Sequence, residues 1–138
     1  MRMPELAYSE DSQVKLKELY FISSSLRDLK KLPDEVRQTF GYALYLAQLG
    51  DKHPSAKPLR GFGGAGVVEV VEDDAGGTYR VIYTVKFKDA VFVLHAFQKK
   101  SKHGITTSLT DIELVKARLK LAATAYAELE REHGQEPN

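Results

Sequence analysis

The residues best suited to chemistry are cations that follow a predicted β-strand. Residues 90–97 are mostly apolar, as in a buried strand. Basic side chains then crowd into residues 99–103 without an acid among them: Lys99, Lys100, Lys102 and His103. A rigid strand that ends in solvated cations can present its charge to an anion. We therefore expect this segment to bind an anionic ligand.

A further cation, Arg80, lies within the preceding predicted strand, residues 79–85. Alternation of side chains places Arg80 on the face of Ile82 and Thr84, opposite Tyr79, Val81, Tyr83 and Val85. An arginine in a strand usually covers apolar surface with its stem, but a rigidly held guanidinium can also bind a phosphate through two hydrogen bonds. Residues 86–89 form a short connection, so an antiparallel hairpin would bring Arg80 towards Lys99 and Lys100.

The loop at residues 51–66 offers two more cations, Lys57 and Arg60, beside a glycine-rich backbone. It is not a P-loop, because the lysine precedes the glycines and no Lys-Ser or Lys-Thr pair follows them. Phe62 and Phe97 could stack on nucleic-acid bases. A core position is the commoner fate of Phe97, which the strand pattern places on the face of Val93 and His95.

The four histidines, His53, His95, His103 and His133, lack metal-ligand spacing. On an apolar strand, His95 is more often a hydrogen-bonded core residue than a general acid or base. The absence of cysteine excludes disulfides, thiol chemistry and cysteine-based zinc sites. No Gly-x-Ser-x-Gly nucleophile motif is present.

Composition predicts one cytoplasmic domain. The chain has 138 residues and a net charge of +1, from 20 basic and 19 acidic residues, so a globally basic nucleic-acid binder is not indicated. No apolar run reaches the roughly 20 residues of a membrane helix, and the first residues lack a signal-peptide core. We expect a disordered extension at 1–13, one domain at 14–131 and a frayed tail at 132–138.

The predicted element order is β-α-α-β-β-β-α, an α+β fold with an antiparallel-dominated sheet. A strand at 16–22 precedes a helix pair, which should cover one sheet face and pack closely at Gly41. The later strands form a meander. The long final helix begins at a capping box, Ser108 with Asp111 or Thr110 with Glu113, and either covers the other face or projects towards a partner.

Three segments in this order, KPLRGFGGAGVVEV, GGTYRVIYTV and AVFVLHAFQKKSKHG, resemble the phage-derived HigB-like branch of the RelE/HigB toxin family. The resemblance spans residues 17–125 and implies the small RelE-like fold. It also implies the toxin of a type II toxin–antitoxin system, an endoribonuclease that cleaves mRNA on the ribosome. The implied partner is a small antitoxin, often a helix-turn-helix protein; neither a metal nor a cofactor is implied.

In such enzymes the ribose 2′-OH attacks the adjacent phosphate, which requires a base, an acid and cations for the developing charge. The resemblance assigns catalysis to Arg80, Lys99 and Lys100. It also matches Lys57 and Arg60 to loop residues of the family, with Lys102 as a close companion of the two catalytic lysines. Together with Phe97, which could stack on a base, and His103 of the cation cluster, these are the residues that we expect to bind RNA. The base is a lysine with a lowered pKa or Glu69, and the acid is His95 or His103; the sequence leaves both open.

Two other functions fit the same fold. A ParE-like protein inhibits DNA gyrase without enzymatic chemistry, although that branch generally lacks the clustered cations. A degenerate toxin would only grip RNA with its basic residues.

Overall fold

The computed structural model describes residues 15–99 and 107–135. Within them the elements are β1 (Glu18–Phe21), α2 (Ser25–Lys30), α3 (Asp34–Gln48), β2 (Lys57–Pro58), β3 (Val67–Asp74), β4 (Gly77–Thr84), β5 (Ala90–Lys99) and α4 (Leu109–Gln135). The α+β class and the element order are as predicted, except that the expected loop 51–66 contains the two-residue strand β2. Residues 1–13, predicted to be a disordered extension, lie outside the described part of the chain.

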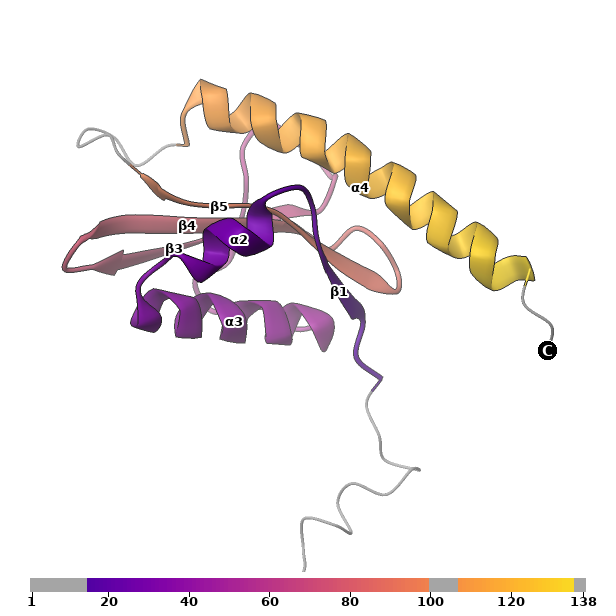
Figure 1. The fold of residues 1–138 in the computed structure, drawn as a ribbon, viewed down its shortest axis with the longest axis horizontal. Helices are drawn as coiled ribbons and strands as arrows, with labels where there is room; N and C mark the ends of the chain where they lie inside the picture. The colour runs from indigo at the N-terminus through magenta and orange to yellow at the C-terminus, as the bar shows by residue number, and fades with distance from the viewer. Residues whose placement is uncertain (1–14, 100–106, 136–138) are drawn as a thin grey trace, which may run out of the picture.

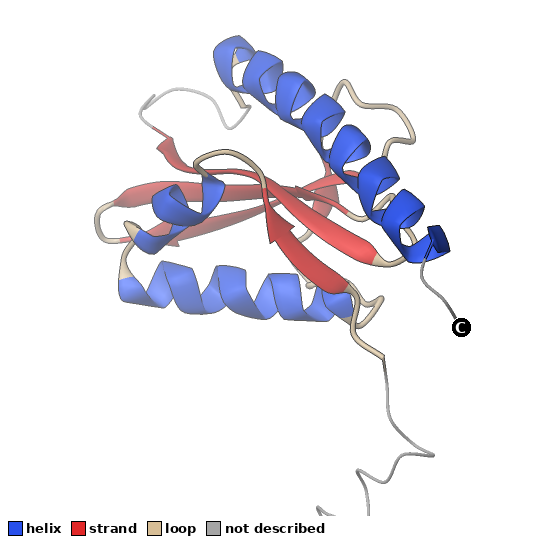
Figure 2. Cartoon of the chain, turned by 45° about the vertical axis from the view of Figure 1, so that its right-hand side comes forward, coloured by secondary structure: helices blue, strands red, loops and turns tan. Residues whose placement is uncertain are grey.

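The strands form one mixed sheet in the order β1-β5-β4-β3-β2 (Figure 2). Short turns join β3, β4 and β5, which therefore pair antiparallel, as β2 and β3 also do. The first strand instead pairs parallel with β5, because the two helices and the meander intervene before the chain returns. The sheet is thus dominated by antiparallel pairs, as predicted.

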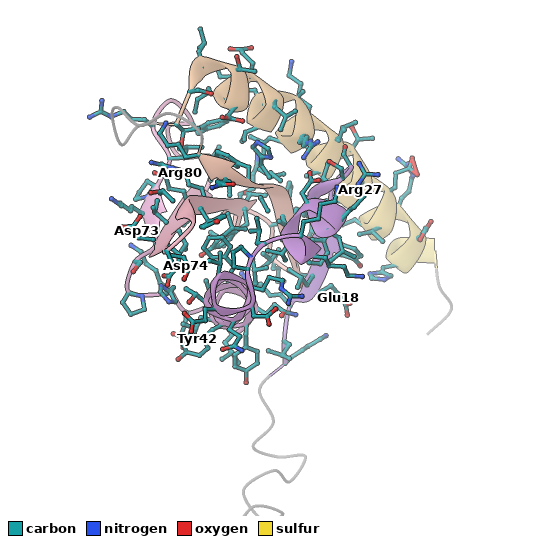
Figure 3. The ribbon with its side chains drawn as sticks, turned by 60° about the vertical axis from the view of Figure 1, so that its left-hand side comes forward. Glu18, Arg27, Tyr42, Asp73, Asp74 and Arg80 are labelled. Carbon is teal, nitrogen blue, oxygen red and sulfur yellow. The ribbon has the colours of Figure 1, made fainter. Side chains whose placement is uncertain are left out.

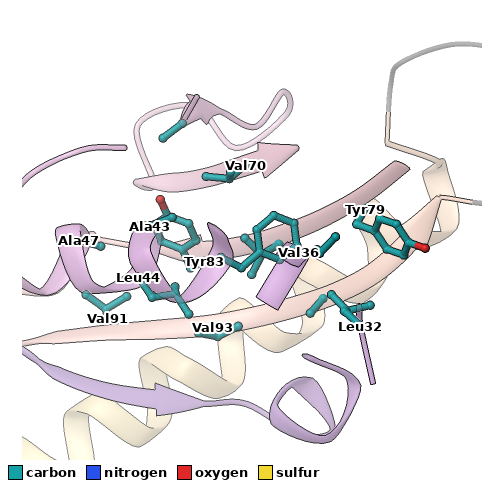
Figure 4. Close-up of a cluster of buried hydrophobic side chains, with 14 residues drawn as sticks. Leu32, Val36, Ala43, Leu44, Ala47, Val70, Tyr79, Tyr83, Val91 and Val93 are labelled. Atoms are coloured by element: carbon teal, nitrogen blue, oxygen red, sulfur yellow. The ribbon is translucent and has the colours of Figure 1, made fainter. Parts of the chain in front are cut away.

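The helix pair covers one face of this sheet (Figure 1). The apolar stripe of α3 packs against alternate residues of β3, β4 and β5, and Figure 4 shows this contact. The residues at the centre of this contact, from α3 and from the sheet, are fully or almost fully buried: Val36, Phe40, Ala43, Val70, Val81 and Tyr83. The expectation of close packing at Gly41 is wrong, because a Cβ atom placed there would meet nothing within 4 Å.

The final helix covers the opposite face, hereafter the α4 face (Figure 1). Val115 and Ala122 are buried against strand residues such as Phe92 and Leu94. The predicted cap is confirmed at Ser108, whose Oγ accepts from the Asp111 amide at 3.2 Å. Leu109, the first residue of α4, is 75% exposed. Helix α4 ends at Gln135, beyond residue 131 where the domain was expected to end.

A β-bulge in β5 changes which side chains share a face. Ile82 pairs with His95 but Tyr83 pairs with Val93, so Leu94 is an extra residue in β5. Val93 consequently packs towards α3, whereas Leu94 packs on the α4 face. The prediction that Phe97 shares a face with Val93 is wrong, because strict alternation does not hold across a bulge. Its shared face with His95 is confirmed by their ring contact.

No helix in the described residues is long and apolar enough to cross a membrane.

Candidate functional site

Cross-strand register gathers the predicted site residues on the α4 face. Arg80 pairs with Phe97, and Thr78, two residues earlier on the same face, pairs with Lys99. Because side chains alternate along a strand, Lys99 and Arg80 project to the same side of the sheet. Lys57 pairs with Glu69, which in turn lies opposite Ile82. The hairpin therefore converges Arg80 and Lys99 on one face, as predicted.

Arg80, Glu69 and Thr107 are joined by three mutual hydrogen bonds, and this group is hereafter the Arg80 triad. Arg80 Nη1 donates to Glu69 Oε2 at 2.9 Å and to Thr107 Oγ1 at 3.2 Å, and Thr107 Oγ1 donates to Glu69 Oε2 at 3.1 Å. Figure 3 shows Arg80 on the strand that faces the first turns of α4. The three residues come from β4, β3 and the segment that leads into α4.

Burial makes the Arg80 triad unusual. The Arg80 side chain is only 2% exposed and that of Glu69 is 13% exposed. A buried guanidinium requires a counter-charge, because removing an ion from water costs several kcal/mol. The reading of Arg80 as a surface arginine is therefore wrong. Its role towards a phosphate stays a prediction, and in this structure it is ion-paired with a carboxylate of its own chain.

His95 ties β5 to the start of α4. Its Nε2 lies 2.8 Å from Asp111 Oδ1, and its ring stacks on Phe97 with centroids 4.1 Å apart. Burial lowers the pKa of His95 below 6.5, and the hydrogen bond and charge of Asp111 oppose this shift. A neutral His95 donates its Nε2–H to Asp111, which leaves Nδ1 as the basic nitrogen. Among the described residues, the buried Nδ1 has no hydrogen-bond partner.

The other predicted residues surround these two contacts. Lys57 and Arg60 are exposed, on β2 and in the glycine-rich loop that follows it. Lys99 is half-buried at the end of β5. Phe97 is half-buried against the core of the α4 face, as a core residue would be, and its contact with RNA stays a prediction. Lys100, Lys102 and His103 lie outside the described residues.

Sequence reasoning missed two polar partners. Asp111 was expected to cap α4, which it does with Ser108, but its second oxygen also binds His95. Thr107 carried no signal, because its contact with Glu69 joins residues 38 positions apart. Glu69 was considered only as a possible base, whereas the structure shows it as the ion-pair partner of Arg80.

A cavity of about 320 Å³ lies apart from these residues. It is lined by residues of the α3 side, including Ala47, Val68 and Tyr83. Burial raises the pKa of Tyr83 to about 12, so its phenol stays neutral at physiological pH. The lining contains none of the predicted site residues. Among the described residues, no group of three or more His, Cys, Asp or Glu side chains could hold a metal ion.

Comparisons with known proteins identify the fold and the family. A mutant of the E. coli toxin RelE in the free state matches with a TM-score of 0.51 and 20% identity, over 76% of this chain and 96% of that chain. The isolated E. coli RelE toxin matches with a TM-score of 0.47 and 24% identity, over 73% and 97%. The intact E. coli RelBE toxin–antitoxin complex contains a chain that matches with a TM-score of 0.45 and 21% identity, over 62% and 99%.

Curated proteins gave no significant sequence match. The first of the structural matches shows that the chain has the RelE-like fold. Residues 27–120, more than half of the chain, match the family model described as "Phage derived protein Gp49-like (DUF891)". The chain therefore belongs to the family of phage-derived Gp49-like proteins.

Proposed function

We propose that this protein is the toxin of a type II toxin–antitoxin system, an endoribonuclease that cleaves mRNA on the ribosome in the cytoplasm. The observation that carries the proposal is the convergence of Arg80, Lys99 and Lys57 on one face of a RelE-like sheet. The family and the toxin with the similar fold support it. As such a toxin, it would be held inactive by a small antitoxin, for which a helix-turn-helix protein is the expected kind.

The chemistry requires no metal. The 2′-oxygen loses its proton to a base and attacks the adjacent phosphorus, while the bond to the 5′-oxygen breaks and that oxygen gains a proton. The products are a 2′,3′-cyclic phosphate and a 5′-OH. Arg80 and Lys99 would stabilise the charge that develops on the phosphate oxygens. Lys57 and Arg60, both exposed, would bind neighbouring phosphates and set the position of the strand.

Burial narrows the choice of proton-transfer groups. The basic Nδ1 of His95 is buried, and its other nitrogen is bound to Asp111, which disfavours His95 as the acid. Glu69 lies beside Arg80 and Lys57, where a substrate phosphate would sit, so it remains a candidate base. His103 and Lys100, the other candidates, lie outside the described residues.

Mapping of mRNA 5′ ends after induced expression tests the proposal. We expect the parent to produce cleavage in phase with codons, and Lys99→Ala and Arg80→Ala to reduce it by about 100-fold, as expected for losing a group that stabilises transition-state charge. Arg27→Ala, which removes an exposed arginine on α2, is the matched control and should cleave as the parent does. Growth arrest without phased cleavage would contradict the proposal.

The burial of Arg80 favours one second candidate, a protein that binds RNA without cleaving it. Its guanidinium is sequestered by Glu69, while Lys57 and Arg60 remain exposed. Toxicity that survives Arg80→Ala, provided that the variant stays folded in a thermal unfolding assay, would favour this binder over the ribonuclease.

A further inference from the structure

The Arg80 triad shows how the free protein occupies its own anion site. Glu69 Oε2 accepts from Arg80 Nη1 at 2.9 Å and from Thr107 Oγ1 at 3.1 Å, so both donors are directed at one carboxylate oxygen. Carboxylates and phosphates both present negatively charged oxygens that accept hydrogen bonds from the planar fork of donors on a guanidinium. An RNA phosphate that entered this site would therefore compete with Glu69 for Arg80.

The surroundings of Glu69 offer it a second partner. Lys57 lies directly opposite Glu69 in the β2–β3 register, and paired residues of antiparallel strands have Cβ atoms about 5 Å apart. Lys57 is exposed, and the Glu69 side chain is 13% exposed whereas that of Arg80 is 2% exposed. Glu69 is therefore the member of the ion pair that lies nearer to solvent and to Lys57. Rotation of the Glu69 side chain away from Arg80 would direct its carboxylate towards Lys57.

We propose that Glu69 is an internal counter-anion that holds the Arg80 site closed in the free protein and withdraws when an RNA phosphate binds. This inference rests on the proposed function, because it takes the Arg80 site to be the phosphate site. In the resting state Glu69 keeps the guanidinium ordered and neutralised. In the bound state the phosphate replaces the carboxylate, and Glu69 moves towards Lys57.

This arrangement selects the kind of anion that can bind. A single free phosphate must displace a carboxylate that is covalently tethered beside Arg80 and has a high effective concentration there. A strand of RNA is held at the same time by Lys57 and Arg60, so its local phosphate concentration is also high. The Arg80 site should therefore exclude isolated anions and accept a phosphate of a polynucleotide.

Binding of a non-cleavable RNA tests the inference without the ribosome. The probe is a fluorescent single-stranded oligonucleotide whose 2′-hydroxyls are all 2′-O-methyl groups, measured by anisotropy at fixed salt. We expect Glu69→Gln to bind it roughly tenfold more tightly than the parent, since a charge-assisted competitor is removed. Glu72→Gln is the matched control: it makes the same charge change on the same strand, but alternation places it on the opposite sheet face.

A second variant distinguishes the loss of the Glu69–Arg80 contact from the change in net charge as the cause of tighter RNA binding. Glu69→Asp keeps the charge but shortens the side chain by one methylene, so it should release Arg80 and also bind RNA more tightly than the parent. Thermal unfolding establishes that each variant is folded. If Glu69→Gln does not fold, the Glu69→Asp result decides.

The inference is wrong if neither Glu69 variant binds the probe more tightly than Glu72→Gln does. That failure is distinct from failure of the proposed function, which concerns cleavage. A parent that cleaves mRNA in phase with codons, together with Glu69 variants of unchanged affinity, would overturn only the inference. Tighter binding by those variants, in a protein that never cleaves, would overturn only the ribonuclease.

Discussion

At the scale of single residues, two buried polar contacts determine what the α4 face can do. The Arg80 guanidinium and the His95 imidazole are both largely removed from water and both rely on a carboxylate. Glu69 satisfies Arg80 across two strands, and Asp111 satisfies His95 from the first turn of α4. When the pKa of a group differs between the folded and the unfolded chain, the free energy of unfolding depends on pH. The environment of His95 can therefore be tested by measuring stability at several pH values.

His95 should make folding stability depend on pH. Burial lowers its pKa in the folded protein, whereas the unfolded chain has the ordinary value of 6.5. Below that value the unfolded chain binds the proton more readily, so the free energy of unfolding falls as the pH drops from 6.5 to the lower pKa of the folded state. Urea denaturation at several pH values measures this loss.

His95→Gln should remove that part of the pH dependence while keeping a hydrogen-bond donor near Asp111. Other charged groups act on His95 as well: Arg118 lowers its pKa and Asp28 raises it, each through space. The control is His133→Gln, which changes an exposed histidine near the end of α4 and should retain the parent's slope. Equal slopes in the parent and in His95→Gln would contradict the assignment.

At the scale of elements, local patterns predicted the hairpin but not its irregularities. Alternation correctly placed Arg80 opposite Tyr79 and Val81, because β4 has no bulge within those residues. The bulge at Leu94 could not be predicted from the sequence, because Leu94 lies in a run of apolar residues in which an extra apolar residue does not alter the pattern. Strand β2 was missed because two residues, one of them proline, carry too little pattern.

Two glycines should respond differently to substitution, because one has a backbone conformation that favours glycine and the other lies in a helix where alanine is preferred. Gly66, which immediately precedes β3, has a φ of +67°, and a Cβ there would lie 3.0 Å from the backbone nitrogen of Lys86. Gly41 lies within α3 with nothing within 4 Å of an added Cβ. We expect Gly66→Ala to lower the free energy of unfolding by about 2 kcal/mol, because it combines left-handed strain with a clash.

Gly41→Ala should instead raise the free energy of unfolding by about 1 kcal/mol, since alanine restricts the unfolded chain and adds no contact penalty in the helix. Both variants change one glycine to alanine, so each serves as the control of the other in urea denaturation. A stabilising Gly66→Ala would show that the loop before β3 can relax away from Lys86.

At the scale of the whole molecule, what the sequence could not predict is the contact between distant segments. The Arg80 triad joins β3, β4 and the segment before α4, and β1 pairs with β5, a strand that both helices separate from it in the sequence. Amphipathic patterns predicted that helices would cover the sheet, yet they left open whether α4 packs on it or meets a partner. Val115 and Ala122 are buried against the strands, so α4 packs on the sheet.

The sheet therefore separates two cores, one under α3 and one under α4. Val36 and Val115 are fully buried and belong to different clusters on opposite faces of the sheet. Val36→Ala and Val115→Ala should each lower the free energy of unfolding by about 2 kcal/mol through lost burial and a residual cavity. Because the sites are independent, the double variant should lose the sum of the two.

Urea denaturation followed by far-ultraviolet circular dichroism measures these losses, with Leu121→Ala as the control at a half-exposed position of α4. A single transition with additive losses would mean that both helical layers and the sheet unfold as one cooperative unit. The Arg80 triad would then persist only while both cores are intact, because its residues come from the shared sheet and from the segment that leads into α4. Two separate transitions in Val115→Ala would instead mean that α4 can detach alone, which would release Thr107 and open the Arg80 site without unfolding the sheet.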